Sequence, residues 1–312
     1  MKTVLQLTPL PVPEGYRPRV ELPVERAFEN PDMTRWLAEH GADVRALVTH
    51  SLRGMPSDLW AQLPGLKLIA NFGAGLDLID LREAAKRHVQ VTYTPDLLTH
   101  DVADLAITLA LAVSRRLLQA DTYVRSAAWG KEPFAPGRST KGKHLGILGL
   151  GRIGQAIAKR AVAFDMHVGY HARRRTDDAF AYFQTAIELA RWSDILIAAV
   201  PGGAETRRMV DHEVLTALGR GGIFINIARG SVVDQSALID ALKSGAIAGA
   251  GLDVFDDQPI DGSAFAGIPN VVLTPHMGSL TTDTRIAMAD SVYSNVQALL
   301  SGGTVQDLAP TP

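Results

Sequence analysis

Two side chains in the last third of the chain have the types that anion binding and proton transfer would need. Arg229 follows the segment Asn226-Ile227-Ala228, and His276 follows Thr274-Pro275. Reduction of a 2-keto acid needs a cation for the carboxylate and carbonyl, a proton donor near physiological pH, and a group that orients the donor. Arg229 and His276 could supply the first two. Taken singly, each also has a plainer interpretation, as a surface ion-pair partner and as a loop histidine held by its neighbours.

A glycine-rich segment, Gly149-Leu150-Gly151-Arg152-Ile153-Gly154, follows an apolar run and opens a helical pattern that carries Ile153, Ile157 and Phe164. In this pattern the first glycine permits a tight turn and the second lets a pyrophosphate approach the backbone. The third allows the helix and strand to pack closely. The helix amino terminus then faces the phosphates. We interpret the segment as a dinucleotide-binding loop, with a simple glycine turn as the alternative.

A basic turn stands where the second strand of such a domain should end, with the sequence Tyr170-His171-Ala172-Arg173-Arg174-Arg175. An acidic residue there would accept hydrogen bonds from an adenosine ribose. This turn has no carboxylate to repel a 2′-phosphate, and arginine forms bidentate bonds to phosphate. We therefore expect NADP(H) to be preferred, with NAD(H) possible, and expect Arg173 and Arg174 to make the contacts while Arg175 faces water. The alternative is a solvated basic turn.

The elements that must position these residues follow a parallel α/β pattern of short apolar runs and helical stretches. In the first hundred residues the expected strands are Val4–Leu7, Val44–His50, Leu66–Phe72 and Val89–Thr94. Six more are expected later, which is the count of a doubly wound dinucleotide-binding sheet. They are Leu145–Leu150, Met166–His171, Asp194–Val200, Ile223–Ala228, Ala248–Val254 and Val271–Thr274.

Two long helices complete the expected organisation. One runs from Asp101, its expected N-cap, to about Gln119, and its apolar stretch Val102–Val113 should be buried because it is too short for a membrane span. The other covers about Thr281–Leu300 and could reach back to the first domain. We expect an α/β fold of two Rossmann-like or flavodoxin-like domains with doubly wound parallel sheets. A cofactor domain, residues 100–282, is inserted in a discontinuous substrate domain, residues 1–99 and 283–312.

Composition excludes several classes of function. The 312-residue chain has 46% hydrophobic and 21% charged residues and a formal net charge of -2, so no long-range field attracts nucleic acid or an anionic membrane. The absence of cysteine excludes disulfides, zinc–thiolate sites and cysteine nucleophiles and fits a reducing compartment, so we expect a cytoplasmic location. No metal-ligand spacing is recognisable among the nine histidines and the carboxylates, so we expect no metal site.

Taken together, these motifs resemble the D-2-hydroxyacid dehydrogenase family in order and approximate spacing. The resemblance rests on the glycine-rich loop, the Asn-x-Ala-Arg-Gly strand end and the Leu-Asp-Val-Phe and Pro-His-x-Gly-Ser segments. It also includes Asn71–Asp77, Val200-Pro201 and Gly230–Asp234, and so covers nearly the whole chain. Within the family, the basic turn looks most like that of NADPH-using glyoxylate/hydroxypyruvate reductases and hydroxyphenylpyruvate reductases.

The resemblance implies a role for each matching position. Arg229 would bind the substrate carboxylate and polarise the carbonyl, while His276 would donate the proton as hydride arrives. Backbone amides of Ala74 and Gly75 would hold the carboxylate from the other domain, and domain closure would bring them toward Arg229. Asp253 would meet the nicotinamide carboxamide, although it could also act only as a cap. The remaining cofactor contacts would come from Gly149, Gly151, Arg152, Ile153, Gly154, Arg173, Arg174, Val200, Pro201, Ile227, Ala228 and Gly278. The family also implies a homodimer, for which the long helix from Asp101 is a candidate interface.

One position departs from the family pattern. Gln258 stands where relatives usually place the glutamate that pairs with the histidine. A carboxylate stabilises a protonated imidazole, whereas an amide can orient the ring without adding charge. We expect His276 to stay neutral to lower pH than in relatives, and Gln258 to act as its orienting group unless Asp257 replaces it. Gln258 also keeps open a formate dehydrogenase-like reaction, and a corepressor-like protein that binds NAD(P) without significant turnover is a further alternative.

Overall fold

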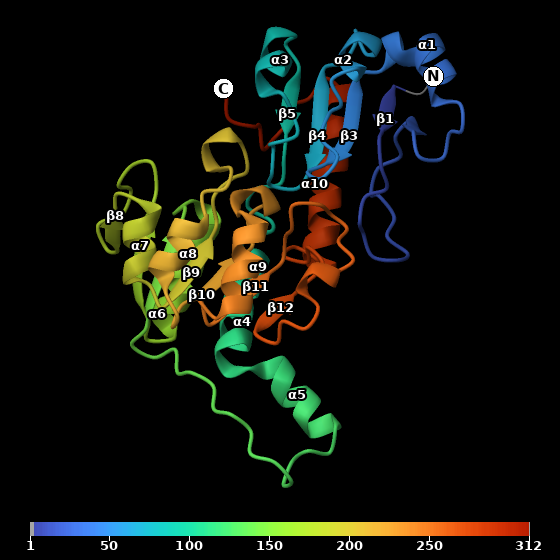
Figure 1. Ribbon diagram of the computed structural model, residues 1–312. Helices are drawn as coiled ribbons and strands as arrows, with labels where there is room; N and C mark the ends of the chain where they lie inside the picture. The colour runs from blue at the N-terminus through green and yellow to red at the C-terminus, as the bar shows by residue number, and fades with distance from the viewer. Residues whose placement is uncertain (1–2, 312) are drawn as a thin grey trace. The chain divides into compact units, whose positions relative to one another are not determined.

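The computed structural model describes residues 3–311, which form two compact units (Figure 1). Unit 1 runs to Leu98 and resumes at Ser279, and unit 2 spans Thr99–Gly278. Residues 1–2 and 312, which the expected substrate domain includes, lie outside the described part of the chain. Each unit contains one parallel sheet, so the expected α/β class with two such domains is confirmed.

Unit 1 is built on a five-stranded parallel sheet with the order β2-β1-β3-β4-β5. Leu5, Leu47 and Ile69 point from three strands into one core, which the helices before β5 cover. The long helix α10 packs against β3 and β4. The elements are β1 (Val4–Gln6), β2 (Val24–Arg26), α1 (Met33–His40), β3 (Ala46–His50), α2 (Leu59–Gln62), β4 (Leu68–Phe72), α3 (Leu81–Lys86), β5 (Gln90–Thr92) and α10 (Thr282–Leu300).

Unit 2 is built on a seven-stranded parallel sheet with the order β12-β11-β10-β9-β6-β7-β8. Helices α4 and α6 pack together on one face, and α7, α8 and α9 form a layer on the other (Figure 1). The elements are α4 (Thr99–Arg115), α5 (Leu117–Arg125), β6 (His144–Leu148), α6 (Arg152–Ala163), β7 (His167–His171), β8 (Ala181–Phe183), α7 (Ala186–Trp192), β9 (Ile195–Ala198), α8 (His212–Leu218), β10 (Ile223–Asn226), α9 (Gln235–Ser244), β11 (Gly249–Leu252) and β12 (Val271–Leu273).

Two edge strands were not predicted from the sequence. β2 and β8 have three residues each, and their burial is partial because each pairs with only one neighbour. β2 reads Val-Glu-Arg, and β8 has one exposed and two half-buried residues, so neither is the buried apolar run that marks the other strands. The later sheet therefore has seven strands rather than the six expected.

The helix expected from Asp101 to Gln119 was wrong at both ends. It begins at Thr99, since neither Thr99 nor His100 interrupts a helix, and Asp101 lies in its first turn rather than at the N-cap. It ends at Arg115 because Arg116 adopts a left-handed conformation with φ 54°, after which α5 begins. An arginine in this conformation has no local sequence signal. Phe164, expected on the apolar face of α6, lies just past its last residue and is 43% exposed.

Candidate active site

The sequence-predicted residues of unit 2 gather at the carboxyl edge of its sheet. Parallel strands all end at the same edge, so loops that follow different strands meet there. The glycine-rich loop follows β6, Arg173 and Arg174 follow β7, and Val200-Pro201 follows β9. Ile227-Ala228-Arg229 follows β10, Asp253 follows β11, and His276 follows β12. The residues expected to act together therefore share one side of unit 2.

The glycine-rich loop lies where the strand order reverses, between β6 and β9. Gly149 has φ +93°, which only glycine adopts readily, and its N–H donates to the carbonyl of His171 at 2.9 Å. A Cβ at Gly154 would lie 2.1 Å from the carbonyl oxygen of Gly149, whereas a Cβ at Gly151 would meet open space. A reversal point of this kind is the usual dinucleotide site of open α/β sheets. The open space beside Gly151, at the amino end of α6, fits a pyrophosphate.

His276 and Gln258 form the hydrogen-bonded pair that the sequence suggested. Nδ1 of His276 lies 2.7 Å from Oε1 of Gln258, and Nε2 of Gln258 donates to the carbonyl of Phe255 at 3.2 Å. This second bond fixes which amide atom faces the histidine. Since Oε1 can only accept, Nδ1 carries a proton and Nε2 is the nitrogen that can exchange one with a substrate.

Asp253 holds the loop that carries His276. Its Oδ1 accepts hydrogen bonds from Thr274 Oγ1 at 2.7 Å and from the Met277 N–H at 2.8 Å, and its Oδ2 accepts from the Gly278 N–H at 2.9 Å. The residue is 2% exposed, and burial raises the pKa of its carboxyl against the lowering effect of these three bonds. Asp253 therefore braces this loop, but it caps no helix, because α10 begins at Thr282 with Thr281 as its N-cap. The nicotinamide contact stays a prediction.

Arg229 sits on a turn that a buried asparagine shapes. Asn226, 1% exposed, accepts from the Ala228 N–H at 3.0 Å and donates to the carbonyl of Arg229 at 3.0 Å. The guanidinium of Arg229 donates to the carbonyl of Ala228 at 2.8 Å and is half-buried. This role of Asn226 was not predicted, although a polar residue at the end of an apolar strand was a usable signal in the sequence. Ile227 and Ala228, which follow Asn226 in the chain, are buried. Pro201, in the loop after β9, is exposed.

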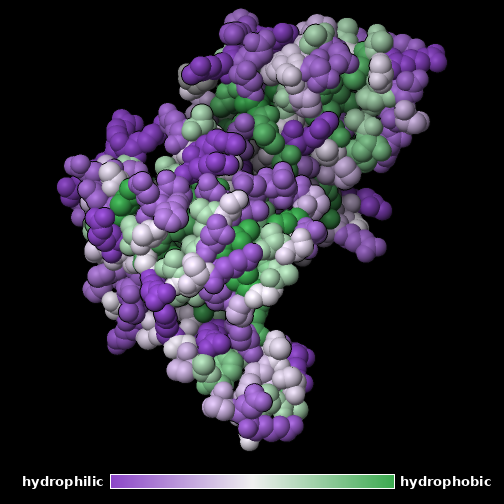
Figure 2. All heavy atoms as spheres, viewed as in Figure 1, coloured by the Kyte–Doolittle hydropathy of each residue, from purple (hydrophilic) through white to green (hydrophobic). Residues whose placement is uncertain are grey.

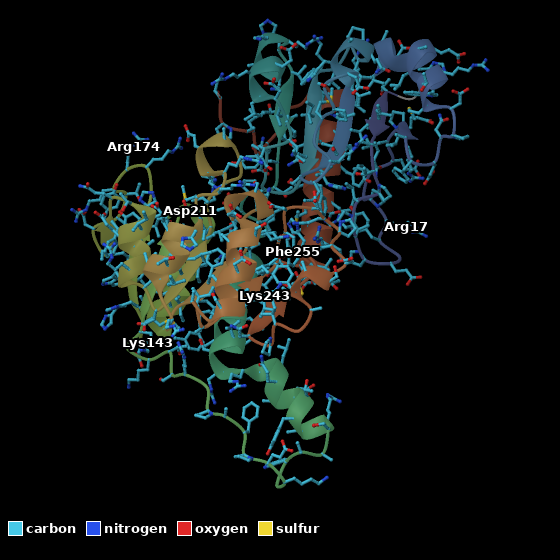
Figure 3. All side chains as sticks on the ribbon, viewed as in Figure 1. Arg17, Lys143, Arg174, Asp211, Lys243 and Phe255 are labelled. Carbon is cyan, nitrogen blue, oxygen red and sulfur yellow. The ribbon has the colours of Figure 1, made fainter. Side chains whose placement is uncertain are left out.

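The basic turn after β7 is exposed, and it has an acidic neighbour that the sequence analysis did not foresee. Nη1 of Arg173 lies 3.4 Å from Oε2 of Glu205, in the short 3₁₀ turn Ala204–Thr206. The turn itself has no carboxylate, but the fold brings Glu205 to it from another loop. Arg174 points away from the sheet (Figure 3). Nε of Arg175 lies 2.7 Å from Oδ1 of Asp178.

The predicted substrate amides of unit 1 lie on a braced turn at the carboxyl end of β4. Asn71 Nδ2 donates to the carbonyl of Gly75 at 3.0 Å, and Ser51 Oγ donates to the same oxygen at 2.8 Å. Gly73, with φ +132°, begins the turn. Among the described residues, the N–H groups of Ala74 and Gly75 have no hydrogen-bond acceptor. Both amides can therefore bind an anion.

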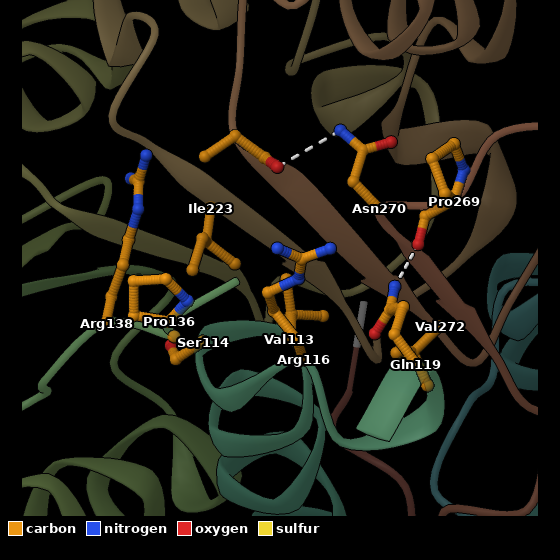
Figure 4. Close-up of a pocket in the computed structure, with 12 residues that line it drawn as sticks. Val113, Ser114, Arg116, Gln119, Pro136, Arg138, Ile223, Pro269, Asn270 and Val272 are labelled. Atoms are coloured by element: carbon orange, nitrogen blue, oxygen red, sulfur yellow. Dashed lines mark hydrogen bonds between the residues drawn. The ribbon is translucent and has the colours of Figure 1, made fainter. Parts of the chain in front are cut away.

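A cavity of about 280 Å³ lies at the opposite, amino edge of the unit 2 sheet (Figure 4). Ile223, Ala248 and Asn270 mark that edge, and Asn270 Nδ2 donates to the carbonyl of Ala248 at 3.0 Å. None of the predicted site residues lines it, so we place the candidate site at the carboxyl edge. Across residues 3–311, no cluster of metal-ligating side chains is present, and no helix is long and apolar enough to span a membrane.

Comparison with known proteins places the chain among 2-hydroxyacid dehydrogenases and keto-acid reductases. Residues 107–278 match the model of the D-isomer specific 2-hydroxyacid dehydrogenase NAD binding domain. The chain is 46% identical to glyoxylate/hydroxypyruvate reductase A of Arabidopsis thaliana and 44% identical to hydroxyphenylpyruvate reductase of Plectranthus scutellarioides, with 89% of each chain covered. The NADPH-dependent glyoxylate/hydroxypyruvate reductase of Sinorhizobium meliloti, solved with NADP and malonate, is 39% identical with a TM-score of 0.89, covering 100% of this chain and 98% of that one.

Proposed function

Because this chain belongs to the D-isomer specific 2-hydroxyacid dehydrogenase family, we propose that it transfers a hydride between NADP(H) and a small 2-keto or 2-hydroxy acid. The observation that carries the proposal is the oriented His276–Gln258 pair, since it prepares one ring nitrogen for proton exchange. The names of the relatives favour glyoxylate and hydroxypyruvate as substrates. We propose the cytoplasm as the place of the reaction, where NADPH supply favours reduction.

In this mechanism each side chain has one task. The nicotinamide, when bound, supplies the hydride to the carbonyl carbon. Arg229 binds the substrate carboxylate and polarises the carbonyl, which stabilises the negative charge that develops on its oxygen. His276 donates the proton from Nε2 to that oxygen, and Gln258 keeps its ring in place. The amides of Ala74 and Gly75 are proposed as further donors to the carboxylate.

The cofactor assignment rests on the loops at the carboxyl edge of unit 2. We propose that Gly149, Gly151 and Gly154 shape the pyrophosphate site, with Arg152 and Ile153 in the first turn of α6. Val200, Pro201, Ile227, Ala228, Asp253 and Gly278 are proposed to border the rest of the cofactor. Arg173 and Arg174 are proposed to bind a 2′-phosphate. The weak, exposed contact to Glu205 leaves Arg173 free to exchange partners.

We propose a homodimer, with an interface on the arm formed by residues 117–134. The helix α4 is the candidate interface named from the sequence. It buries its apolar face against the sheet of unit 2, so little apolar surface of α4 remains for a dimer contact. By contrast, α5 has no buried residue, and the arm projects from unit 2 with apolar spheres on its surface (Figures 1 and 2). Its exposed apolar side chains are Leu117, Leu118, Val124, Trp129 and Phe134. Large exposed apolar patches indicate association.

The experiment that tests the proposed function compares initial rates of NADPH and NADH oxidation with glyoxylate, hydroxypyruvate and 4-hydroxyphenylpyruvate. We expect turnover that prefers NADPH and falls by about 100-fold or more in Arg229→Met, which removes the cation that stabilises the developing charge. An Arg82→Ala variant, which changes an exposed arginine of α3, is the matched control. Tight NADPH binding without turnover on any keto acid would instead support the corepressor-like alternative, and NADP⁺ reduction by formate would support the formate dehydrogenase-like one.

A further inference from the structure

Three basic side chains gather at the carboxyl edge of the unit 1 sheet. His50 ends β3, Arg53 lies in the turn after it, and Arg285 lies in the second turn of α10. The guanidinium carbon of Arg285 is 5.4 Å from the ring centre of Phe72, the last residue of β4. Burial, and repulsion from both arginines, lower the pKa of His50. His50 is the register partner of Phe72 between β3 and β4, so His50 and Arg285 lie beside the same residue of this edge.

Nothing in the described chain neutralises this cluster. Neither Arg53 nor Arg285 has an ion pair or a side-chain hydrogen bond among residues 3–311. Nε of Arg285 is buried and has no hydrogen-bond partner among the described residues, and the guanidinium lies over the face of Phe72. Burial of a cation without a partner is unfavourable, and an aromatic face compensates for it only in part. This arrangement indicates that an anion is the partner.

The cluster also lies where the topology favours a ligand. The strand order β2-β1-β3-β4-β5 reverses between β1 and β3, and ligands of open α/β sheets bind outside the carboxyl ends of strands at that point. One further buried polar atom without a partner belongs to the same edge, the hydroxyl oxygen of Thr8 after β1, and a hydroxyl can donate to an anion. His50 contributes a donor, because its Nδ1 accepts from the Leu52 N–H at 3.1 Å and its neutral ring then carries the proton on Nε2.

We propose that His50, Arg53 and Arg285 form a subsite for a second anionic group, a carboxylate or phosphate at the far end of a 2-keto acid. The inference rests on the proposed function and adds to it that dianionic keto acids are bound in preference to monoanionic ones of the same skeleton. In the proposed mechanism the carboxylate next to the carbonyl already has Arg229 and the amides of Ala74 and Gly75. One carboxylate has about four acceptor positions, so three more donors need another anion.

The test compares keto acids that share a carbon skeleton and differ in the distal group. Oxaloacetate is compared with 2-oxobutanoate, and the phosphate ester of hydroxypyruvate with hydroxypyruvate itself, by kcat/KM with NADPH. The variants are Arg53→Ala, Arg285→Met and, as the matched control, Arg82→Ala. We expect the ratio of dianion to monoanion kcat/KM to fall about tenfold in each cluster variant and to stay unchanged in the control. The substrate pair with the larger fall identifies the distal group as carboxylate or phosphate.

Other results would overturn the proposal. An equal loss on both members of each pair would place the cluster on the carboxylate next to the carbonyl or in the support of the fold. If the ratio of dianion to monoanion kcat/KM is unchanged in the variants, the cluster is a solvated surface that binds no distal group. Arg53 is exposed, so Arg53→Ala gives a folded variant even if Arg285→Met does not. If the wild-type chain reduces no keto acid, the proposed function fails. Calorimetric titration with malonate and with acetate then tests the subsite alone, which requires tighter malonate binding that Arg53→Ala abolishes.

Discussion

Nδ1 of His276 lies 2.7 Å from Oε1 of Gln258, and the same amide is held by a bond from its Nε2 to the carbonyl of Phe255. The histidine is thus oriented as it would be by a carboxylate, but its partner carries no negative charge. Orientation and charge, which a glutamate supplies together, are separated in this site. The separation makes the charge effect measurable by a single substitution.

Gln258→Glu should shift the pH profile of keto-acid reduction upward by about one unit or more, because a carboxylate stabilises the imidazolium that donates the proton. The measurement is kcat/KM for NADPH-driven reduction between pH 5 and pH 9. Asp257→Asn, which changes the exposed neighbouring carboxylate, should leave the profile in place. An unchanged midpoint in Gln258→Glu would show that His276 is not the proton donor.

Thr274→Val should move the acid limb of the activity profile to higher pH. Burial raises the pKa of Asp253, and the hydrogen bond from Thr274 is the first of the effects that lower it, so its loss raises the pKa further. Protonated Asp253 cannot accept all three bonds that hold the His276 loop. Activity should therefore be lost at a higher pH on acidification, while the rate near neutrality changes less. A limb that stays in place would contradict this role for Asp253.

Removal of Arg173 and Arg174 should weaken NADPH binding selectively. The double variant Arg173→Ala/Arg174→Ala should raise the KM for NADPH about tenfold or more and leave the KM for NADH nearly unchanged, since only NADPH carries the 2′-phosphate. Arg175→Ala serves as the control, because Arg175 pairs with Asp178. Glu205→Gln should lower the KM for NADPH by removing the competing carboxylate near Arg173. Equal effects on both cofactors would reject the phosphate contact.

Alanine substitutions in the glycine-rich loop should separate folding from binding. Gly154→Ala should destabilise the protein by about 1–3 kcal/mol, because the new Cβ would overlap the carbonyl of Gly149. Gly151→Ala meets open space and should change stability by less than about 1 kcal/mol, as expected for an N-cap change, yet weaken NADPH binding. Thermal denaturation and fluorescence titration with NADPH measure the two effects. Loss of stability without loss of binding in Gly151→Ala would place the pyrophosphate elsewhere.

The sequence by itself determined the α/β class and indicated which residues to propose for the site. Local patterns are sufficient for this, because apolar runs mark the buried strands and the spacing of Gly149, Gly151 and Gly154 marks the turn between a strand and a helix. Once the strands are parallel, their carboxyl ends lie on one edge. Arg229, Asp253 and His276 could therefore be assigned to one side of a sheet before any distance was known.

Only the tertiary structure decided which side chains meet. Glu205 reaches Arg173 and Arg285 packs on Phe72 from distant parts of the chain, and such contacts depend on strand order and helix packing. The three hydrogen bonds of Asp253 are of the same kind, since they join the ends of β11 and β12. The left-handed Arg116 that ends α4 is equally invisible to periodicity. Local sequence sets the backbone of each element, but the packing of distant elements sets the partners of each charge.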